Sequence, residues 1–399
     1  MRSAERRYEQ GVGGMNFAER YAGLKPSGML KIFQAADADP DIISLGVGEP
    51  DFDTEPDIID EAARAAKAGY THYGPIQGFE DVRRAVCSYW DRRYGLKSVP
   101  EEVQIMAGGV QSVYLGLQAL LDPGDEVITA EPCFAPYFDQ IYQNRGVIVH
   151  LPSSEEEGFV PSAEAIERAV TSRTKVLMIC SPGNPTGRVI PRSRMEAIAA
   201  VAEKHDLTVF SDEIYDSMVY NGKHVPFASI PGMKERTLTM GGLSKSHCMT
   251  GWRIGYAIGP APLIKIMTLL GANQTYGVNV PTQRAAMYAL NNHDRKIEER
   301  AKIFRERLAY TAKRLNAMPG IRCPEPEGAF YLFPEIRGTG LSSEAFAWAL
   351  LEKGRVAVLP GSSFGECGEG YVRIACTCSM ENLEKAMDRM DIFLQTLNR

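Results

Sequence analysis

The alternation of short β-branched runs with longer helical patterns is the feature of this sequence that most constrains its fold. Between the helical stretches lie the runs EVIT near 126, VIVH near 147, KVLMIC near 175, LTVFSD near 207 and RTLTMGG near 236. Strands that alternate with helices are typical of a parallel sheet with helices packed on both faces. The sequence therefore predicts an α/β fold built on a doubly wound, mostly parallel sheet.

Apolar residues spaced every three or four positions identify the helices that accompany these strands. This spacing covers residues 58–68, 79–94 and 110–121, and it returns in a long charged stretch over residues 293–317. A Pro-Gly pair follows the long stretch, so we expect the helix to end there. A shorter mixture of helical and strand patterns continues to the C-terminus.

The length of the chain predicts more than one domain, because single hydrophobic cores stop growing below 399 residues. We expect a large domain over residues 46–285. A smaller α+β domain is expected from residues 286–399 together with residues 17–45, because chain termini often lie close together. Residues 1–16 combine charge with several glycines and have no apolar periodicity, which is typical of a loose terminal extension. Its role stays open.

Composition excludes several classes of protein. Hydrophobic residues make up 44% and charged residues 24%, as in soluble globular proteins. No apolar run reaches the ~18 residues that cross a bilayer, and the N-terminus lacks a secretory signal, so we expect a cytoplasmic protein without membrane contact. A net charge of −6 with scattered basic residues excludes a nucleic-acid backbone as partner. The eight cysteines lack paired CxxC spacing, which predicts reduced structural thiols and no metal site.

Polar clusters directly follow several of the predicted strands: SPGNPTG at 181–187, SDEIYD at 211–216 and GGLSKSH at 241–247. Ligands of open α/β sheets bind beyond the carboxyl ends of the strands, so we expect these clusters to converge on one pocket. In the first cluster, prolines and glycines fix a turn around Asn184, whose amide can donate a hydrogen bond into the pocket. A plain strand-to-helix turn is the structural alternative.

The second and third clusters carry groups suited to a flat ligand with a carbonyl carbon. The carboxylate of Asp212 can keep a ring nitrogen protonated and the phenol of Tyr215 can bond a ring oxygen, although an N-cap at Asp212 is the alternative. Lys245 can bond covalently to a carbonyl cofactor if burial lowers its pKa. A solvated surface lysine is its alternative, and the company of Ser244 and Arg253 favours the site.

The segment GGVQS at 108–112 lies between a predicted strand and a predicted helix. The first N–H groups of such a helix face outward and can hold a phosphate. Arg253 would add a charge-assisted, two-pronged partner to these amides. The sequence therefore predicts that one end of the ligand is a phosphate.

In chain order, GVGEPDFDTEP, THYGPIQG, SPGNPTG, SDEIYD, SK followed by MTGWRIGY, PEGAFYLFP and GYVRIA closely resemble the class I and II aminotransferases of pyridoxal 5'-phosphate (PLP) fold type I. The resemblance spans about residues 20 to 395. It implies a transaminase that uses PLP to move an amino group from an L-amino acid to a 2-oxo acid, with 2-oxoglutarate the expected acceptor, by a ping-pong mechanism. It also implies a homodimer whose active sites lie at the subunit interface.

By position, the resemblance makes Lys245 the Schiff-base lysine and Asp212 the partner of the pyridine nitrogen. Asn184 and Tyr215 become the partners of the ring oxygen. Further cofactor contacts are implied for Gly109, Val110, Gln111, Ser244 and Arg253 at the phosphate, for Tyr73 reaching it across the dimer, and for Phe134 stacked on the ring.

Substrate contacts are implied as well. Arg373, in YVRIA, matches the arginine that grips the α-carboxylate in a two-pronged pair, and Gly48 and Asn184 lie where the family approaches that carboxylate. For Phe134, a plain core phenylalanine is the structural alternative.

The chain departs from the family pattern in ways that bear on specificity. Gly242 stands where many relatives have a serine, so the phosphate either loses one hydroxyl contact or takes it from Ser244. The region GANQTYGVNVP contains no arginine, although aspartate-specific relatives that use a partner-chain arginine carry it near there. Aromatic, alanine-like, acidic and branched donors all stay open.

Rival functions follow from the same residues. A carbon–sulfur lyase or another eliminating relative would use the same cofactor contacts. A PLP-sensing regulator joins this fold to a DNA-binding domain, for which the short N-terminal extension leaves no room. An α/β domain without PLP would require every strand-end cluster to be turn chemistry alone.

Overall fold

The structure, a computed structural model, describes Ala18, Tyr21 and residues 28–397. The predicted extension over residues 1–16 and most of residues 17–27 therefore lie outside the described part of the chain.

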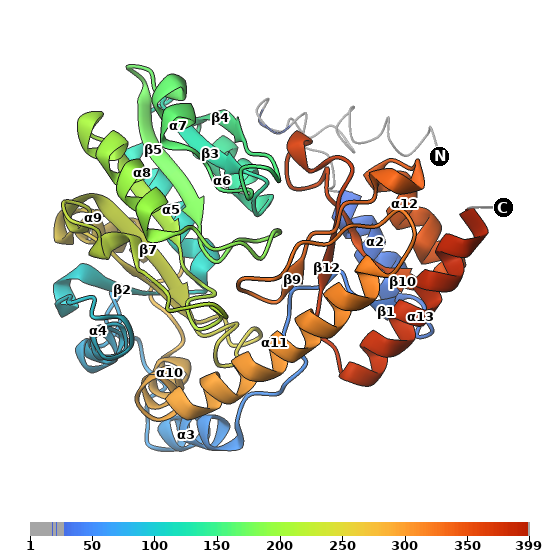
Figure 1. The fold of residues 1–399 in the computed structure, drawn as a ribbon. Helices are drawn as coiled ribbons and strands as arrows, with labels where there is room; N and C mark the ends of the chain where they lie inside the picture. The colour runs from blue at the N-terminus through green and yellow to red at the C-terminus, as the bar shows by residue number, and fades with distance from the viewer. Residues whose placement is uncertain (1–17, 19–20, 22–27, 398–399) are drawn as a thin grey trace.

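A seven-stranded sheet forms the centre of the larger part of the molecule, in the order β2-β8-β7-β6-β5-β3-β4 (Figure 1). The strands are β2 Val103–Met106, β3 Glu126–Glu131, β4 Val147–Pro152, β5 Thr174–Cys180, β6 Thr208–Asp212, β7 Thr237–Gly242 and β8 Gly255–Ile258. All neighbouring pairs are parallel except those of β8, which is antiparallel to both β2 and β7. The predicted mostly parallel sheet is confirmed.

Helices cover both faces of this sheet. They include α5 Gly109–Leu120, α6 Pro136–Gln143, α7 Ala163–Ala169, α8 Arg192–Lys204 and α9 Ala261–Ala272. Successive residues of β5 belong to opposite cores, because Val176 packs with α5, α6 and α9 whereas Leu177 packs with α7 and α8. A strand buried on both faces is continuously apolar, which explains why KVLMIC carries no polar alternation.

A third group of helices packs beside β2 and β8. It consists of α3 Pro56–Lys67, α4 Glu80–Tyr94 and α10 Val280–Asn292. The helix α11 Asp294–Asn316 then extends from α10 to the C-terminal part of the molecule (Figure 1). The helices α3, α4 and α11 lie within one or two residues of the predicted ranges 58–68, 79–94 and 293–317.

The C-terminal part forms a second, smaller α+β layer. Its elements are β9 Tyr331–Leu332, α12 Ser343–Ala349, β10 Val356–Ala357, β11 Leu359–Pro360, β12 Val372–Ala375 and α13 Met380–Leu397. The strands β11, β12 and β9 pair in that order, antiparallel throughout. Short 3-10 or π turns complete the chain: η3 Pro100–Glu102, η4 Phe227–Ser229, η5 Lys234–Arg236, η6 Arg337–Thr339, η7 Leu350–Gly354 and η8 Glu366–Gly368.

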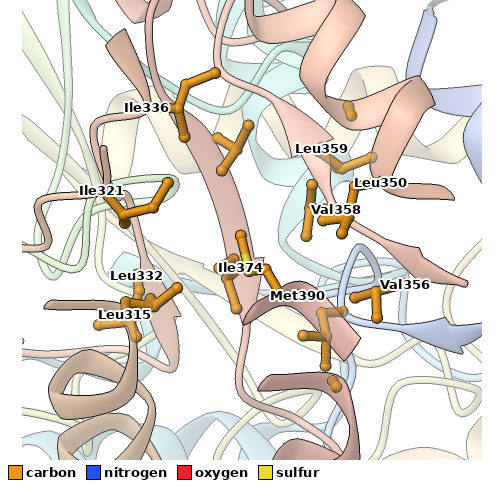
Figure 2. Packing of buried hydrophobic residues seen from close by; sticks show 14 of the residues in the cluster. Leu315, Ile321, Leu332, Ile336, Leu350, Val356, Val358, Leu359, Ile374 and Met390 are labelled. Carbon is orange, nitrogen blue, oxygen red and sulfur yellow. The ribbon is translucent and has the colours of Figure 1, made fainter. Parts of the chain in front are cut away.

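The N-terminal elements α2 Gly28–Asp37 and β1 Ile43–Ser44 pack on this smaller part rather than on the large sheet. β1 pairs with β10, and Ile32 of α2 lies in the same buried cluster as residues from α11, α12 and α13. Figure 2 shows the centre of that cluster, where side chains of α11, β9, β10, β11, β12 and α13 meet. This packing supports the domain division at residues 46–285, which we retain as a proposal.

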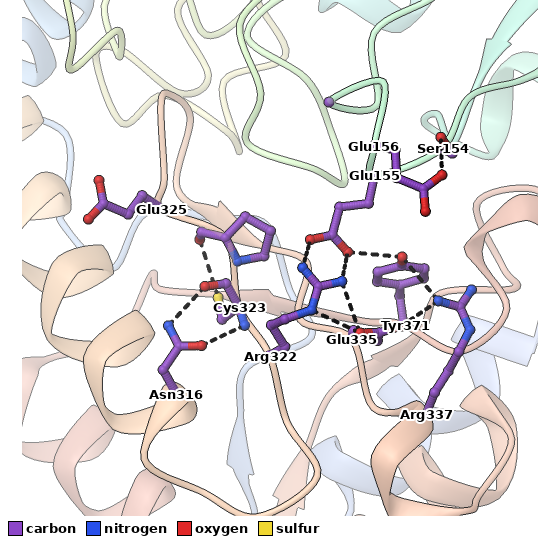
Figure 3. Close-up of polar contacts among 12 residues, drawn as sticks. Ser154, Glu155, Glu156, Asn316, Arg322, Cys323, Glu325, Glu335, Arg337 and Tyr371 are labelled. Atoms are coloured by element: carbon purple, nitrogen blue, oxygen red, sulfur yellow. Dashed lines mark hydrogen bonds and ion pairs between the residues drawn. The ribbon is translucent and has the colours of Figure 1, made fainter.

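An ionic network joins the two parts beyond the edge strand β4 (Figure 3). Arg322 places its Nη2 atom 2.7 Å from Glu155 Oε2 and 3.0 Å from Glu335 Oε2, and the Tyr371 hydroxyl donates to Glu155 over 3.0 Å. Arg322 is exposed, so solvent screens much of its attraction. The network nevertheless holds the loop after β4 against Tyr371, two residues before Arg373.

Candidate active site

A cavity of about 350 Å³ opens at the carboxyl ends of the central strands. It is lined by residues that follow β2, β3, β5, β6 and β7, together with residues of α2, β9 and β12. The predicted site residues on its wall are Gly48, Gly109, Val110, Phe134, Asn184, Asp212, Tyr215, Ser244, Lys245, Arg253 and Arg373. The strand-end clusters therefore do converge on one pocket.

Lys245 follows β7 and points its amine into this cavity. Its Nζ donates a hydrogen bond to the backbone carbonyl oxygen of Gly48 over 2.6 Å. Burial lowers the pKa of Lys245 to about 8; the negative charge of Glu49 opposes this shift, and the positive charge of Arg373 adds to it. A larger fraction of the amine is therefore neutral, and so nucleophilic, than in an ordinary lysine.

Asp212 ends β6 and lines the same cavity as Lys245. One carboxylate oxygen accepts from the Tyr137 hydroxyl and the other from the backbone N–H of Ile214 over 3.1 Å. Burial raises the pKa of Asp212, and these hydrogen bonds oppose the rise. Since neither donor is charged, the site favours a cationic partner for this carboxylate.

Tyr137 of α6 is a residue that sequence reasoning missed. Its ring packs edge-on against Phe134, with ring centroids 5.5 Å apart, in the first turns after β3. The only signal was its position three residues after Phe134, in the segment that leads from β3 into α6.

The Tyr215 hydroxyl lies 2.9 Å from the hydroxyl of Tyr331, and both side chains are buried. Burial raises the pKa of Tyr215 well above its usual range, so the phenol stays protonated. Tyr331 comes from β9 and was also missed, although it stands within the motif PEGAFYLFP.

Arg373 of β12 is a buried guanidinium, only 5% exposed, whose charge faces the cavity. Nη1 donates to Asn184 Oδ1 over 2.9 Å and Nη2 to the carbonyl oxygen of Gly46 over 2.5 Å. Nε has no hydrogen-bond partner among the described residues. A buried cation with a spare N–H and no carboxylate of its own suits an anionic ligand group.

A cradle for a second anion lies where α5 begins. Gly108 has a φ of +83°, and a Cβ at this position would come within 2.6 Å of Arg253 Nη2. The guanidinium therefore reaches the helix N-terminus only because residue 108 is a glycine. Free helix N–H groups beside an arginine fit a phosphate, as predicted from GGVQS.

The structure explains why position 242 holds a glycine where many relatives have a serine. A Cβ at Gly242 would lie 2.9 Å from Ile214 Cδ1 and 3.3 Å from the Cα of Gly255, so Ile214 fills the space that a serine would need. Ser244 is buried and lines the cavity, which keeps it available as the hydroxyl donor.

The remaining predicted residues lie away from the cavity. The Gln111 side chain turns back to accept from the Ala107 N–H over 2.8 Å, because it caps the start of its own helix. Tyr73 is 85% exposed and packs on the ring of Tyr276, with centroids 5.0 Å apart. Within one chain, therefore, the side chain of neither residue reaches the pocket.

The described part of the chain holds no cluster of three or more His, Cys, Asp or Glu side chains suited to a metal ion. In the same part, no helix has the length and apolar character of a membrane span. Residues that line the cavity without having been predicted include Met29 and Phe33 of α2, and also Phe364.

Comparison with known proteins gives a consistent assignment. Residues 40–390 match the family model described as aminotransferase class I and II. An aspartate aminotransferase of Pyrococcus horikoshii is 40% identical over 381 residues, which cover 95% of this chain and 97% of that protein. An aromatic-amino-acid aminotransferase of Thermococcus litoralis is 39% identical over 388 residues, which cover 96% of this chain and 99% of that protein.

The crystal structure of an aspartate aminotransferase from Rhizobium meliloti superimposes with a TM-score of 0.92 at 34% identity, covering 96% of this chain and 99% of that one. This chain belongs to the class I and II aminotransferase family.

Proposed function

We propose that this aminotransferase works as a PLP-dependent homodimer in which Lys245 holds the cofactor covalently and moves the proton of the substrate's α-carbon. The observation that carries the proposal is the placement of a low-pKa lysine, a buried carboxylate and a buried guanidinium around one cavity. When bound, PLP supplies an aldehyde that bonds to amines and a pyridinium ring that takes up charge from the α-carbon.

The cofactor ring has a chemically matched set of partners in this cavity. Asp212, whose other hydrogen bonds come from uncharged donors, would hold the ring nitrogen in its protonated form. Asn184 and Tyr215 would bond the ring oxygen, and Phe134 would pack on the ring face. Burial of the Asp212 carboxylate makes a cationic neighbour energetically favourable, which supports this orientation.

The phosphate end would lie in the cradle at the start of α5. We assign it to Arg253, to the hydroxyl of Ser244 and to the backbone N–H groups of Gly109 and Val110, because the Gln111 N–H donates to the carbonyl oxygen of Gly108 over 3.2 Å. The side chain of Gln111 takes no part, because it bonds back to Ala107. Tyr73 of the partner subunit would complete the phosphate contacts.

The substrate's α-carboxylate would bind to Arg373, next to the backbone of Gly48 and the amide of Asn184. The substrate's amino group would replace the Lys245 amine at the cofactor's aldehyde carbon, and the Nζ atom freed in this way would accept the α-proton and return it to that carbon. A 2-oxo acid would leave, and a second 2-oxo acid, for which we propose 2-oxoglutarate, would take up the amino group in a ping-pong sequence.

Surface features of the single chain support a homodimer. Tyr73 is almost fully exposed and Leu269 of α9 is 60% exposed, although both are large and apolar. An open groove of about 760 Å³, lined by Trp252, Thr275 and Gly277 among others, shares Thr250 and Arg253 with the cavity. A second copy covering this groove would enclose the phosphate end and bring Tyr73 to it. A cytoplasmic location stays part of the proposal, supported by the eight free cysteines.

The pKa of Lys245 predicts how cofactor uptake depends on pH. Only the neutral amine attacks an aldehyde, and with a lowered pKa this form becomes the major one above about pH 8. The rate of covalent PLP attachment to cofactor-free enzyme should rise about tenfold between about pH 7 and pH 9 and then level off. Growth of the visible absorption band measures this rate, and loss of the band on reduction with borohydride identifies it as the Schiff base. A rate still rising about tenfold per unit through pH 10 would point to an ordinary lysine.

The function itself is tested with a panel of amino donors and 2-oxoglutarate. We expect glutamate to form in a one-to-one ratio with the 2-oxo acid from the donor, and aspartate and aromatic amino acids are the first donors to try, because relatives carry those names. The carbon–sulfur lyase alternative is not favoured by these aminotransferase relatives. Ammonia and pyruvate released from cysteine-type substrates, without glutamate, would reverse that conclusion.

A further inference from the structure

Tyr331 lines the cavity and contacts groups to which different functions are assigned. Its hydroxyl meets that of Tyr215 at 2.9 Å, and its ring centroid lies 4.5 Å from the guanidinium carbon of Arg373. The ring is 2% exposed and belongs to an aromatic cluster with Phe304 and Phe330. One side chain thus touches both the phenol assigned to the cofactor and the cation assigned to the substrate.

The backbone around Tyr331 is fixed just as closely. Tyr331 pairs with Ala375 in the ladder between β9 and β12, the strand that carries Arg373. A Cβ at Gly187 would come within 2.5 Å of the Tyr331 carbonyl oxygen, so the loop of Asn184 closes against this residue. A Cβ at Gly48 would come within 2.0 Å of the Tyr331 hydroxyl. Glycines at both positions leave the room that this tyrosine occupies.

The direction of the hydroxyl contact follows from counting protons. A phenol has one proton to donate and lone pairs to accept. If Tyr215 gives its proton to the ring oxygen of a bound ligand, the bond between the two tyrosines must be donated by Tyr331. Such a chain of hydrogen bonds strengthens the outer bond, because each donor polarises the next.

The ring contact acts on a different group. The Nε atom of Arg373 has no hydrogen-bond partner among the described residues. The guanidinium carbon lies 4.5 Å from the ring centroid of Tyr331 and 4.8 Å from that of Phe364. Aromatic faces attract a guanidinium and fix its plane, which sets the direction of the free N–H groups.

We propose that Tyr331 is a positioning residue that fixes Tyr215 through its hydroxyl and Arg373 through its ring, and so couples the cofactor's oxygen contact to the substrate's carboxylate contact. The proposal rests on the assignment of the cavity as the PLP site. It separates into two testable parts, because the hydroxyl and the ring can be removed one at a time.

The substitution Tyr331→Phe removes the hydroxyl and keeps the ring over Arg373. With a weaker bond from Tyr215, the ligand's ring oxygen keeps more negative charge, so the adjacent nitrogen of Lys245 holds its proton more tightly. In the holoenzyme we expect the pH midpoint of the visible absorption band to move up by about half a unit. We expect kcat to fall about two- to tenfold with KM for the amino acid within about twofold of wild type.

The substitution Tyr331→Leu removes the ring as well. We expect KM for amino acids to rise a further three- to tenfold or so, because Arg373 loses an aromatic face. Partial misfolding would lower kcat by reducing active enzyme, but it would leave the KM and the band's midpoint unchanged. The split between the two variants therefore distinguishes positioning from a loss of folded protein.

Tyr220→Phe is the matched control. Tyr220 packs against the same aromatic cluster, and its hydroxyl donates to the carbonyl oxygen of Ala329 rather than to Tyr215 or Arg373. This variant should keep the wild-type midpoint and KM. A Tyr331→Phe enzyme that titrates like wild type would overturn the inference, whereas wild-type protein without any visible band would instead overturn the assignment of the cavity to PLP.

Discussion

Replacing Lys245 with alanine is expected to lower transamination by about 10⁴-fold or more, while the protein still binds the cofactor. Nζ of Lys245 is the only described side-chain amine on the cavity wall, so no neighbouring amine can take over the proton transfer. The other contacts of the cavity, at Asp212, Tyr215 and Arg253, are left in place. A coloured complex that turns over extremely slowly is therefore the expected result.

The measurement combines single-turnover kinetics with an absorption spectrum of the purified variant. Lys385→Ala is a suitable control, since this lysine of α13 is exposed and pairs only with Glu381. A small primary amine added to the Lys245→Ala enzyme should restore part of the rate, because it supplies the missing base. Wild-type-like turnover without added amine would remove Lys245 from the mechanism.

Much of this site was predictable because of the geometry of parallel sheets. The clusters containing Asn184, Asp212 and Lys245 each follow a strand directly, and parallel strands end at one edge of a sheet. Their convergence therefore needed only the strands to be recognised. The short β-branched runs of β5, β6 and β7 made that recognition possible.

Residues that depend on short elements or on side-chain packing were not predictable in the same way. Tyr331 lies in a two-residue strand, which is too short to show any periodicity, and Phe33 reaches the cavity from α2, far away in sequence. Tyr137 lies on the buried face of α6, and the sequence does not distinguish it from the other core residues of that helix. For Gln111, the motif predicted the backbone position but not the side-chain rotamer. The side chain accepts a hydrogen bond from the Ala107 N–H, just before its own helix, and does not enter the cavity.

The antiparallel strand β8 is another feature that the pattern did not reveal. Its four residues, Gly255–Ile258, lie between β2 and β7, and both of these strands run antiparallel to β8. A Cβ at Gly255 would come within 2.9 Å of the backbone of Gly108 and Gly109. Close approach of these backbones brings the start of α5 to the cavity. The phosphate cradle therefore depends on a contact between Gly109 and Gly255, which are 146 positions apart in the sequence.

Replacing Asp212 with asparagine should have the next largest effect, a fall in kcat of roughly two orders of magnitude, which corresponds to ~3 kcal/mol of transition-state stabilisation. The substitution keeps the size of the side chain and leaves an oxygen that can accept from Tyr137. It removes the negative charge, and its NH₂ group cannot accept a proton from a ring nitrogen. The ring would lose its positive charge and with it the capacity to take up electrons from the α-carbon.

Glu213→Gln provides the contrast, since Glu213 is the next residue of the chain and is itself buried. Its carboxylate does not line the cavity; it accepts from Ser211 and Phe227 and pairs with His224 at 2.6 Å. Removing this charge should lower the midpoint of thermal unfolding, because a buried pair is broken, and leave kcat and KM of the folded enzyme close to wild type. The Asp212→Asn enzyme should show the reverse, with a small thermal change and a large loss of kcat.

Equal rates for Asp212→Asn and wild type would mean that the ring nitrogen of the cofactor lies elsewhere, because the charge of a carboxylate beside it cannot be removed without cost to the reaction.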